Sequence, residues 1–153
     1  MSGKFDRILN RLRPLAENHN ENNFCHVAVL IKAGKVITCG YNSMRGNISL
    51  HAERDAIYKY LSIIGISLSL NNTRCMKKIQ RTMSSISILV IRWKGDAFRY
   101  SKPCSCCVSI LKTVGIRKVY YSNNEGDIEI DKTDEICTNH LSTYYRQTKG
   151  IRK

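Results

Sequence analysis

The chain has 153 residues, 42% of them hydrophobic and 24% charged, which fits one globular domain with enough apolar residues to bury a core. No low-complexity stretch lacks apolar residues, so this composition excludes a disordered or fibrous protein. Lys and Arg number 25 against 12 Asp and Glu, and the formal net charge of +13 favours partners with phosphates or other anionic groups.

The N-terminal residues 1–20 contain no continuous apolar segment, and the apolar runs elsewhere are shorter than the ~20 residues of a membrane span. We therefore expect a soluble, intracellular protein of the cytoplasm with no membrane span. Its seven cysteines are an odd number in a chain without a secretory signal. This favours metal ligation or free thiols over a disulfide framework.

The first elements are predicted from the spacing of apolar residues. These residues recur at helical spacing over 5–12 and stop before Pro14, which predicts a short amphipathic helix. The β-rich segments 25–31 and 36–42 flank a short Gly-containing turn. They predict a β-hairpin that ends at Asn42.

A second helix and a long connection follow the hairpin. A loop over 43–49 leads to residues 50–64, whose broad apolar face predicts a helix with His51 and Glu53 in its first turn. Residues 65–85 then shift to Ser, Asn and basic side chains. We interpret them as an insertion or a long, partly helical connection.

The second half of the chain alternates strands and helices. Residues 86–93 form a continuous β-branched run, which is typical of a central strand buried on both faces. A helix is predicted to begin at the cysteines after Pro103 and to end near Gly115, and a strand is predicted over 119–123. The segment after Asn124 is a candidate for one further strand.

Strands that alternate with helices after an opening hairpin predict a mixed sheet with helices on both faces. We therefore expect an α/β protein, a three-layer α/β/α sandwich with a mixed five-stranded sheet. Residues 1–153 would form this single domain, with the insertion at 65–85 and a basic C-terminal tail.

Two short motifs carry residue types that suit a zinc site. His51-Ala52-Glu53 supplies a histidine and a carboxylate, and Pro103-Cys104-Ser105-Cys106-Cys107 supplies two cysteines at C-x-x-C spacing. Zinc held by three protein ligands with one open position activates a water molecule for hydrolytic attack. A carboxylate beside the metal can then move protons without ligating it. The two motifs together contain all these parts.

Both motifs are predicted to open a helix. Cys104 and Cys107 stand three residues apart in the first turn, so their thiolates project from nearly the same side, where the positive helix end favours ionisation. Pro103 suits the entrance of that helix. Since His51 begins its own helix, two helix N-termini would converge on one site, with Glu53 within reach of the water.

The chain resembles the cytidine and deoxycytidylate deaminase superfamily. HAERDAI is similar to the first zinc motif of that superfamily, and SKPCSCC is similar to the second. The run HVAVLIKAGKVITCGYNSMRG resembles its opening hairpin, so the resemblance covers roughly residues 24–123. Such proteins occur in large DNA viruses as well as in cells. The resemblance implies the cytidine deaminase fold, Zn²⁺ as cofactor and hydrolytic deamination, a reaction of pyrimidine nucleotide metabolism.

The resemblance also implies roles for individual residues. His51, Cys104 and Cys107 would ligate zinc, and Glu53 would be the catalytic proton carrier. Other residues would bind the substrate. Asn42 would bind the sugar or the base, and the polar edge of the base would be bound by the backbone around Ala52 and by the Lys102-Pro103 peptide. His26 would contact the substrate from the start of its strand. A homo-oligomer is expected by the same resemblance.

Two features depart from compact members of the superfamily. The segment between His51 and Cys104 is longer, and the excess corresponds to residues 65–85, which would cover the site or bind a partner. Cys106 stands beside the second cysteine ligand, where it would compete for metal or pack in the core. We favour core packing.

Three functions are compatible with these residues. We favour zinc-dependent hydrolytic deamination of a cytosine nucleoside or nucleotide (cytidine, deoxycytidine or dCMP) to the uracil form with release of ammonia. The second is deamination of cytosine or adenine in RNA or single-stranded DNA, with the basic surface contacting phosphates. The third is a basic structural or nucleic-acid-associated protein on a deaminase fold. Intact Glu53 argues against the third, because structural zinc needs no carboxylate there.

Basic residues are spread along the chain with two partial concentrations. A solvated surface and a polyanion-binding surface are both consistent with this distribution. The first concentration is Arg74, Lys77, Lys78 and Arg81, and the second is Arg146, Lys149, Arg152 and Lys153.

Overall fold

A computed structural model describes residues 3–18, 24–45 and 48–140. The predicted basic C-terminal tail lies outside the described residues. The main strands are β1 (Phe24–Lys32), β2 (Lys35–Tyr41), β5 (Ile86–Lys94), β7 (Lys118–Ser122) and β8 (Ile128–Lys132). They form a sheet in the order β2-β1-β5-β7-β8, in which β5 and β7 are parallel and the other pairs antiparallel. The predicted mixed sheet is confirmed, and the short strand β6 (Ala97–Arg99) extends it by pairing with β5.

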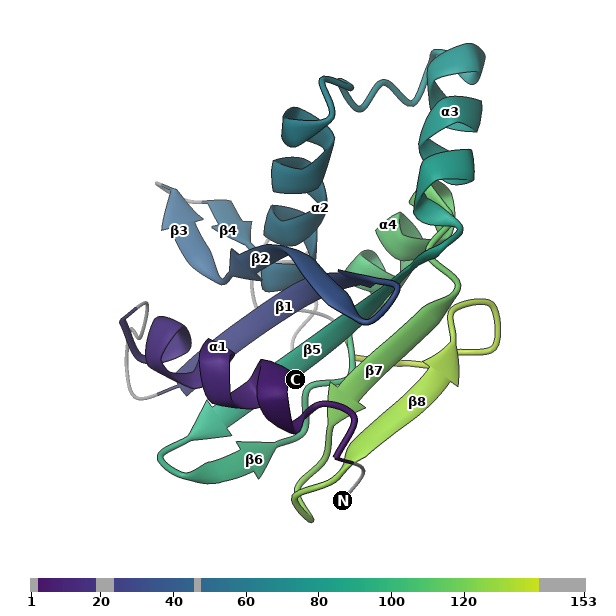
Figure 1. The fold of residues 1–153 in the computed structure, drawn as a ribbon. Coiled ribbons are helices and arrows are strands. Elements are labelled where there is room, and N and C mark those ends of the chain that lie inside the picture. Colours follow the sequence, from purple (N-terminus) through teal and green to yellow (C-terminus); the bar gives the residue numbers. More distant parts are fainter. Residues whose placement is uncertain (1–2, 19–23, 46–47, 141–153) are drawn as a thin grey trace.

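Helices cover both faces of this sheet, which confirms the predicted three-layer sandwich (Figure 1). Helix α1 (Asp6–Asn18) lies on one face. The other face carries α2 (Ala52–Ile63), α3 (Thr73–Met83) and α4 (Ser105–Val114). Each face therefore has its own apolar core, and β5 separates the two.

The sequence of β5 explains its central position. Ile88 and Val90 are fully buried among α2, α3 and α4, whereas Leu89 and Ile91 are fully buried on the side of α1. Because successive side chains of a strand point to opposite faces, only an uninterrupted apolar run can fill both cores.

Helix α1 is longer than predicted. It was expected to end before Pro14, but it continues through that residue to Asn18. Proline removes one backbone hydrogen bond and disfavours a helix interior. The last turns are nevertheless held on the sheet, because Leu12 and Ala16, on either side of Pro14, are both buried in the core beneath α1.

The segment 65–85 contains helix α3, which packs against the sheet and α4. Ile79 and Met83 are fully buried beneath α2, α3 and α4. The Gln80 side chain donates a hydrogen bond to the carbonyl of Thr113 in α4 (3.1 Å). The side chains on the outward face of α3 are exposed and basic: Arg74, Lys77, Lys78 and Arg81.

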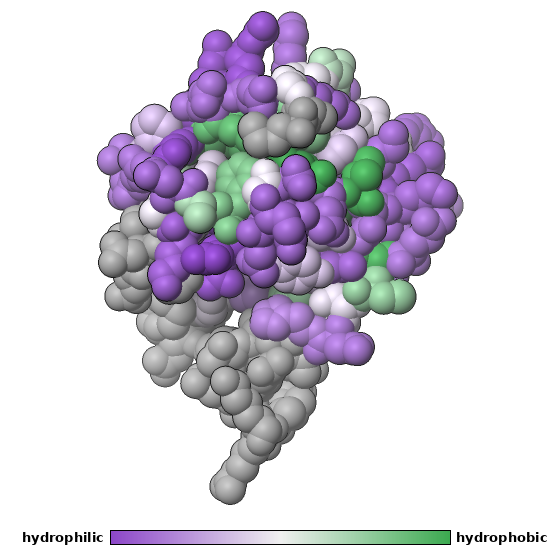
Figure 2. Space-filling view, turned by 90° about the horizontal axis from the view of Figure 1, so that it is seen from below, coloured by the Kyte–Doolittle hydropathy of each residue, from purple (hydrophilic) through white to green (hydrophobic). Residues whose placement is uncertain are grey.

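Two further features complete the description of the fold. The predicted loop 43–49 contains a small antiparallel pair, β3 (Ser43–Arg45) and β4 (Ile48–Leu50), which leads the chain from β2 to α2. Figure 2 shows the molecule from below, where hydrophilic side chains surround a smaller hydrophobic area. No helix in the described part of the chain has the length and apolar character needed to cross a membrane.

Gly40 in β2 lies directly against the backbone of α2. A Cβ atom at this position would lie 2.2 Å from the carbonyl oxygen of Ala52 and 2.3 Å from the amide nitrogen of Ala56. Both neighbours are backbone atoms of α2, so neither can move without moving the helix. Only glycine allows β2 and α2 to approach so closely.

We expect Gly40→Ala to lower the free energy of unfolding by at least about 3 kcal/mol, because overpacking against backbone exceeds the usual cost of a core methyl group. Urea unfolding followed by circular dichroism measures this change. Gly65→Ala is the matched control, since its φ of +68° is unfavourable for alanine but its surroundings are open. The control should lose only about 1 to 2 kcal/mol. Equal losses in the two variants would contradict the close contact.

Candidate metal centre and active site

The end of β2 is fastened to the first turn of α2 by two hydrogen bonds. The side-chain oxygen of Asn42 accepts from the N–H of Ala52 (2.8 Å), and the Asp55 carboxylate accepts from the N–H of Tyr41 (3.0 Å). His51 is the N-cap residue of α2, with an extended backbone and no capping bond from its side chain. Its imidazole is therefore not used by the helix and can contact other groups.

The cysteines lie at the start of α4, as the sequence predicts. Cys104 is the N-cap residue with an extended backbone, Cys107 lies in the first turn, and both are buried. Gly115 ends the helix in the left-handed conformation, with φ of +90°. The beginning of α4 is thus defined at the cysteines and its end at a glycine, which confirms the predicted boundaries.

A network of buried hydroxyl groups fixes the backbone just before Cys104. The Ser101 hydroxyl donates to the carbonyl of Val90 in β5 (2.7 Å), and the N–H of Ser122 donates to the Ser101 oxygen (2.8 Å). The Ser122 hydroxyl in turn donates to the carbonyl of Arg99 (2.6 Å). Sequence reasoning missed these serines, because an isolated serine in a loop or at a strand end carries no signal of its partners.

His51, Cys104 and Cys107 converge on one point between the two helix N-termini. The Nδ1 atom of His51 lies 3.2 Å from the Sγ atom of Cys107 and 3.5 Å from the Sγ atom of Cys104. The three ligand atoms all lie within 4.8 Å of one another. One imidazole nitrogen and two thiols form a ligand set that zinc prefers, with a fourth position left for water or substrate. The residues therefore fit the metal that the sequence predicts.

The two cysteine thiols differ strongly in acidity. Hydrogen bonds from the Cys107 thiol and from His51 lower the pKa of Cys104 to about 3, although burial opposes this change. The same bond to Cys104, together with burial, raises the pKa of Cys107. The bond to Cys104 raises the pKa of His51. One thiolate is therefore already favoured at this position, as a cation site requires.

Glu53 lies in the first turn of α2, buried beside the three ligands. Only 1% of its surface is exposed, and burial raises the pKa of its carboxyl group. Its Oε2 atom has no hydrogen-bond partner among the described residues. A buried carboxylate oxygen without a partner is costly in a folded protein, so it marks a position where a substrate or water is expected to bind.

His26 and Asn42 form a second polar pair near the ligands. The Asn42 amide nitrogen donates to the Nδ1 atom of His26 (3.1 Å), while its oxygen is held by Ala52. Burial, followed by the charge of Arg92, lowers the pKa of His26 to about 4, so the ring is neutral at pH 7. With Nδ1 accepting, Nε2 carries the proton. This Nε2 atom is buried and has no partner among the described residues.

Lys102 and Pro103 lie between the hydroxyl network and Cys104. The Lys102 ammonium group forms an ion pair with Asp131 in β8 (3.1 Å) and lies 5.4 Å from the ring centre of Tyr121. Tyr121 donates its hydroxyl proton to the same carboxylate (3.0 Å). The Lys102 side chain therefore anchors the loop to the sheet, and the next residue, Pro103, is buried.

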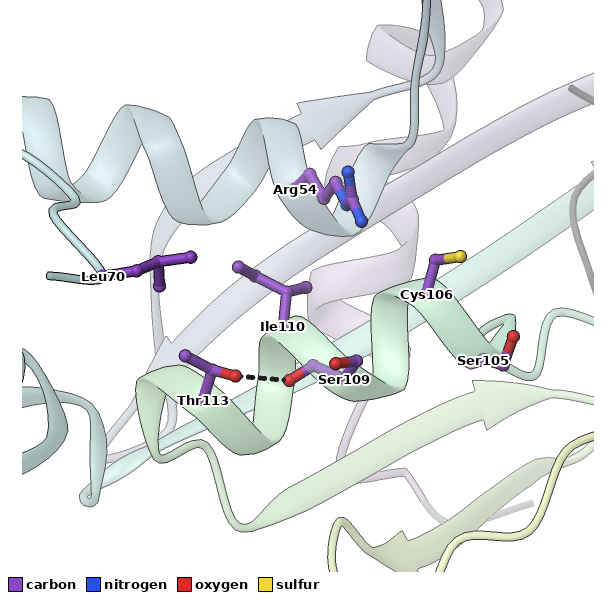
Figure 3. A pocket seen from close by; sticks show the side chains of 7 residues that line it. All are labelled: Arg54, Leu70, Ser105, Cys106, Ser109, Ile110 and Thr113. Atoms are coloured by element: carbon purple, nitrogen blue, oxygen red, sulfur yellow. Dashed lines mark hydrogen bonds between the residues drawn. The ribbon is translucent and has the colours of Figure 1, made fainter. Parts of the chain in front are cut away.

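Cys106 does not pack in the core as expected. It is half-buried and lines a surface cavity of about 370 Å³ along α4 (Figure 3). Consecutive helical residues point about 100° apart, so Cys106 faces away from Cys107 and the metal ligands. Figure 3 shows its thiol on the side of Arg54, with Ile110 and Leu70 farther along the cavity.

The comparisons with known proteins agree with this geometry. A family model described as the cytidine and deoxycytidylate deaminase zinc-binding region matches residues 4–123. The chain belongs to this family. Its zinc-binding character and its deaminase fold are thereby established together with the ligand cluster. A search of curated proteins found no match.

Solved structures share the fold of this family member. A cytidine deaminase from Burkholderia pseudomallei aligns with a TM-score of 0.58 and 17% sequence identity, over 92% of this chain and all of that one. A dCMP deaminase from the cyanophage S-TIM5, solved in complex with dCMP and dUMP, aligns with a TM-score of 0.50 and 17% identity. That alignment covers 80% of this chain and 84% of the phage protein.

The ligand geometry predicts different effects for the three neighbouring cysteines. We expect Cys104→Ser and Cys107→Ser each to weaken zinc binding by about a hundredfold or more, because each removes one thiolate from a site with three protein ligands. Competition with a chromogenic chelator measures the affinity. Cys106→Ser is the matched control and should bind zinc normally. Loss of zinc from the control alone would show that Cys106 is a ligand.

Proposed function

We propose that the protein catalyses hydrolytic deamination of a cytosine nucleoside or nucleotide to the uracil form with release of ammonia. The observation that carries this proposal is the buried Glu53 carboxyl group, whose Oε2 atom has no partner, beside the ligand cluster. Zinc, when bound by His51, Cys104 and Cys107, lowers the pKa of a water molecule so that it can attack at neutral pH. The protein residues supply the proton transfers and the positioning.

Glu53 is proposed to carry protons between water and the base. The attack adds a water oxygen to C4 of cytosine, and Glu53 accepts the proton that this water releases. Glu53 then gives this proton to N3 of the ring. It next takes the remaining proton from the oxygen added to C4 and passes it to the amino group, which leaves as ammonia while the C4 carbonyl forms. Burial raises the pKa of Glu53, which favours returning the proton within the same cycle.

The surrounding residues are proposed to orient the substrate. Asn42 and His26 would contact the sugar, since the Nε2 atom of His26 carries an unused proton at this position. The Lys102-Pro103 peptide would contact the polar edge of the base. Ala52 is proposed to contact the base through its backbone, but its N–H already donates to Asn42. A substrate would have to replace that bond or use the adjoining peptide.

The second candidate function is deamination within RNA or single-stranded DNA. Helix α3 favours it, because its outward face combines the exposed side chains of Arg74, Lys77, Lys78 and Arg81, and the helix contains no acidic residue. Such a face attracts phosphates, and its binding would weaken steeply as salt increases. The same face supports the third candidate, a nucleic-acid-associated protein without turnover.

We expect Glu53→Gln to lower turnover by about 10²- to 10⁴-fold while leaving zinc content and folding unchanged, because an amide cannot carry the proton. Ammonia release and metal content are measured on the same preparation. The control is Glu17→Gln, at an exposed position on α1, which should retain full activity. Turnover by Glu53→Gln at the wild-type rate would show that another group moves the proton.

A panel of substrates separates the three candidate functions. We expect ammonia release from cytidine, deoxycytidine or their monophosphates by the zinc-loaded protein. Release only from cytosine- or adenine-containing oligonucleotides would establish the second candidate. No release from any substrate, with one zinc bound per chain, would favour the third candidate over both enzymes.

A further inference from the structure

Helix α3 carries its basic side chains along one face. Arg74, Lys77, Lys78 and Arg81 follow one another at spacings of three and four residues, so they lie side by side on the helix, and all four are exposed. The sequence of the helix contains no acidic residue. Neighbouring like charges destabilise a helix, so this face is unfavourable unless anions from elsewhere balance it.

A second basic group continues this face at the end of α4. Gly115, which ends α4, packs against α3, because a Cβ atom there would lie 3.1 Å from the Cα atom of Gln80. Lys112, Arg117 and Lys118 stand within three residues of Gly115 along the chain, and all three are exposed. We call these three residues and the four basic residues of α3 the basic surface.

Carboxylate groups of the protein neutralise little of the basic surface. Within the described ranges, none of its seven side chains forms an ion pair with an acidic residue. Asp134 and Glu135 lie near Arg117, because the N–H of the preceding Thr133 donates to the carbonyl of Arg117 (2.9 Å). Glu135 is already paired with Lys132 (3.0 Å). Asp134 alone cannot balance seven cations, so the surface keeps a large positive charge.

The basic surface lies away from the candidate metal centre. Helix α3 contacts α4 near its C-terminal end, where the Gln80 side chain donates to the carbonyl of Thr113 (Figure 1). The ligands Cys104 and Cys107 lie at the opposite end of the same helix. The nine residues from Cys104 to Thr113 correspond to about 14 Å of helix. A large anion can therefore contact the basic surface without entering the site of Glu53.

Charge and shape favour a polynucleotide as this anion. Helix α3 has 11 residues, a length of about 16 Å, over which a duplex presents on the order of ten phosphates. An anionic membrane is less favoured, because the apolar residues Ile79 and Met83 of α3 are fully buried and cannot enter lipid. The basic surface consists of Arg and Lys alone and has no aromatic side chain that could stack on a base. Its contacts would therefore be to phosphates.

We propose that the basic surface binds the phosphate backbone of a polynucleotide, without reading its bases, at a site separate from the candidate active site. The polynucleotide held there is not the substrate. This inference does not rest on the proposed function, because a protein held on nucleic acid by α3 can take free nucleosides or nucleotides at Glu53. It separates association with nucleic acid from deamination within it.

The test measures binding of the zinc-loaded protein to a short fluorescein-labelled DNA duplex by fluorescence anisotropy over a series of salt concentrations. Two double variants each remove two charges: Lys77→Gln with Lys78→Gln, and Arg117→Gln with Lys118→Gln. Each should weaken binding by about ten- to thirtyfold at physiological salt. Each should also reduce the magnitude of the slope of log K against log salt concentration by about 2. Circular dichroism checks that both variants are folded.

The matched control removes the same charge from the opposite face of the sheet. Arg7→Gln with Arg11→Gln changes two exposed residues of α1, and the affinity should fall by less than about threefold. Glu53→Gln should bind the duplex as the wild type does. Because the readout is binding, the absence of any turnover would refute the proposed function and leave this test intact.

Other results would overturn the proposal. Equal losses in the control and in the two double variants would show that only the net charge matters. Binding of a single-stranded oligonucleotide more than about tenfold tighter than of the duplex, or a dependence on duplex sequence, would show that bases are contacted. Binding to vesicles that contain phosphatidylserine, with no binding of the duplex, would assign the basic surface to a membrane.

Discussion

The position of His51 and Glu53 depends on the contact between β2 and the first turn of α2. Gly40 allows the strand and helix backbones to approach, and the bonds from Asn42 to Ala52 and from Asp55 to Tyr41 fix their relative position. His51 and Glu53 lie at the start of this helix, so the contact of the helix with the sheet determines where their side chains lie. Asn42 also holds His26. One asparagine thereby couples the metal ligands to the proposed substrate-binding residues.

The second half of the site is organised differently, through buried hydroxyl groups and charge. Ser101 binds the backbone before Cys104 to Val90 of β5 and to Ser122 of β7, and Ser122 also binds Arg99 at the end of β6. The Cys107 thiol and the His51 ring then lower the pKa of Cys104 and favour one thiolate at this position. The three ligand atoms of this site all lie within 4.8 Å of one another. The buried carboxyl group of Glu53 lies beside these ligands, and its proposed role is to accept a proton rather than to ligate the metal.

The sequence predicted those parts of the molecule that depend on local pattern. The apolar run of β5, the hairpin before Asn42 and the cysteines at the start of α4 each have a periodic or capping signal, and the two motifs identified the ligand set. Other features depend on contacts between distant segments and have no such signal. Examples are the Ser101–Ser122 bonds, the direction of Cys106 and the continuation of α1 through Pro14. In the last case the packing of Ala16 on the sheet outweighs the unfavourable effect of proline on the helix. The roles of His26 and Asn42 stay predictions.

The positive charge is a further property whose arrangement in space cannot be predicted from the sequence pattern. A net charge of +13 indicates an anionic partner, but the count cannot say which cations are available to it. In the structure, Lys59 and Lys102 are paired with Asp55 and Asp131, so they are largely neutralised. Strand register also places Arg92 beside both His26 and Arg99, although the three residues are not neighbours in the sequence. A one-residue change of register would turn these side chains to the opposite face of the sheet. Which basic side chains lie together is therefore a property of strand pairing, whereas overall charge affects the rate at which anions approach.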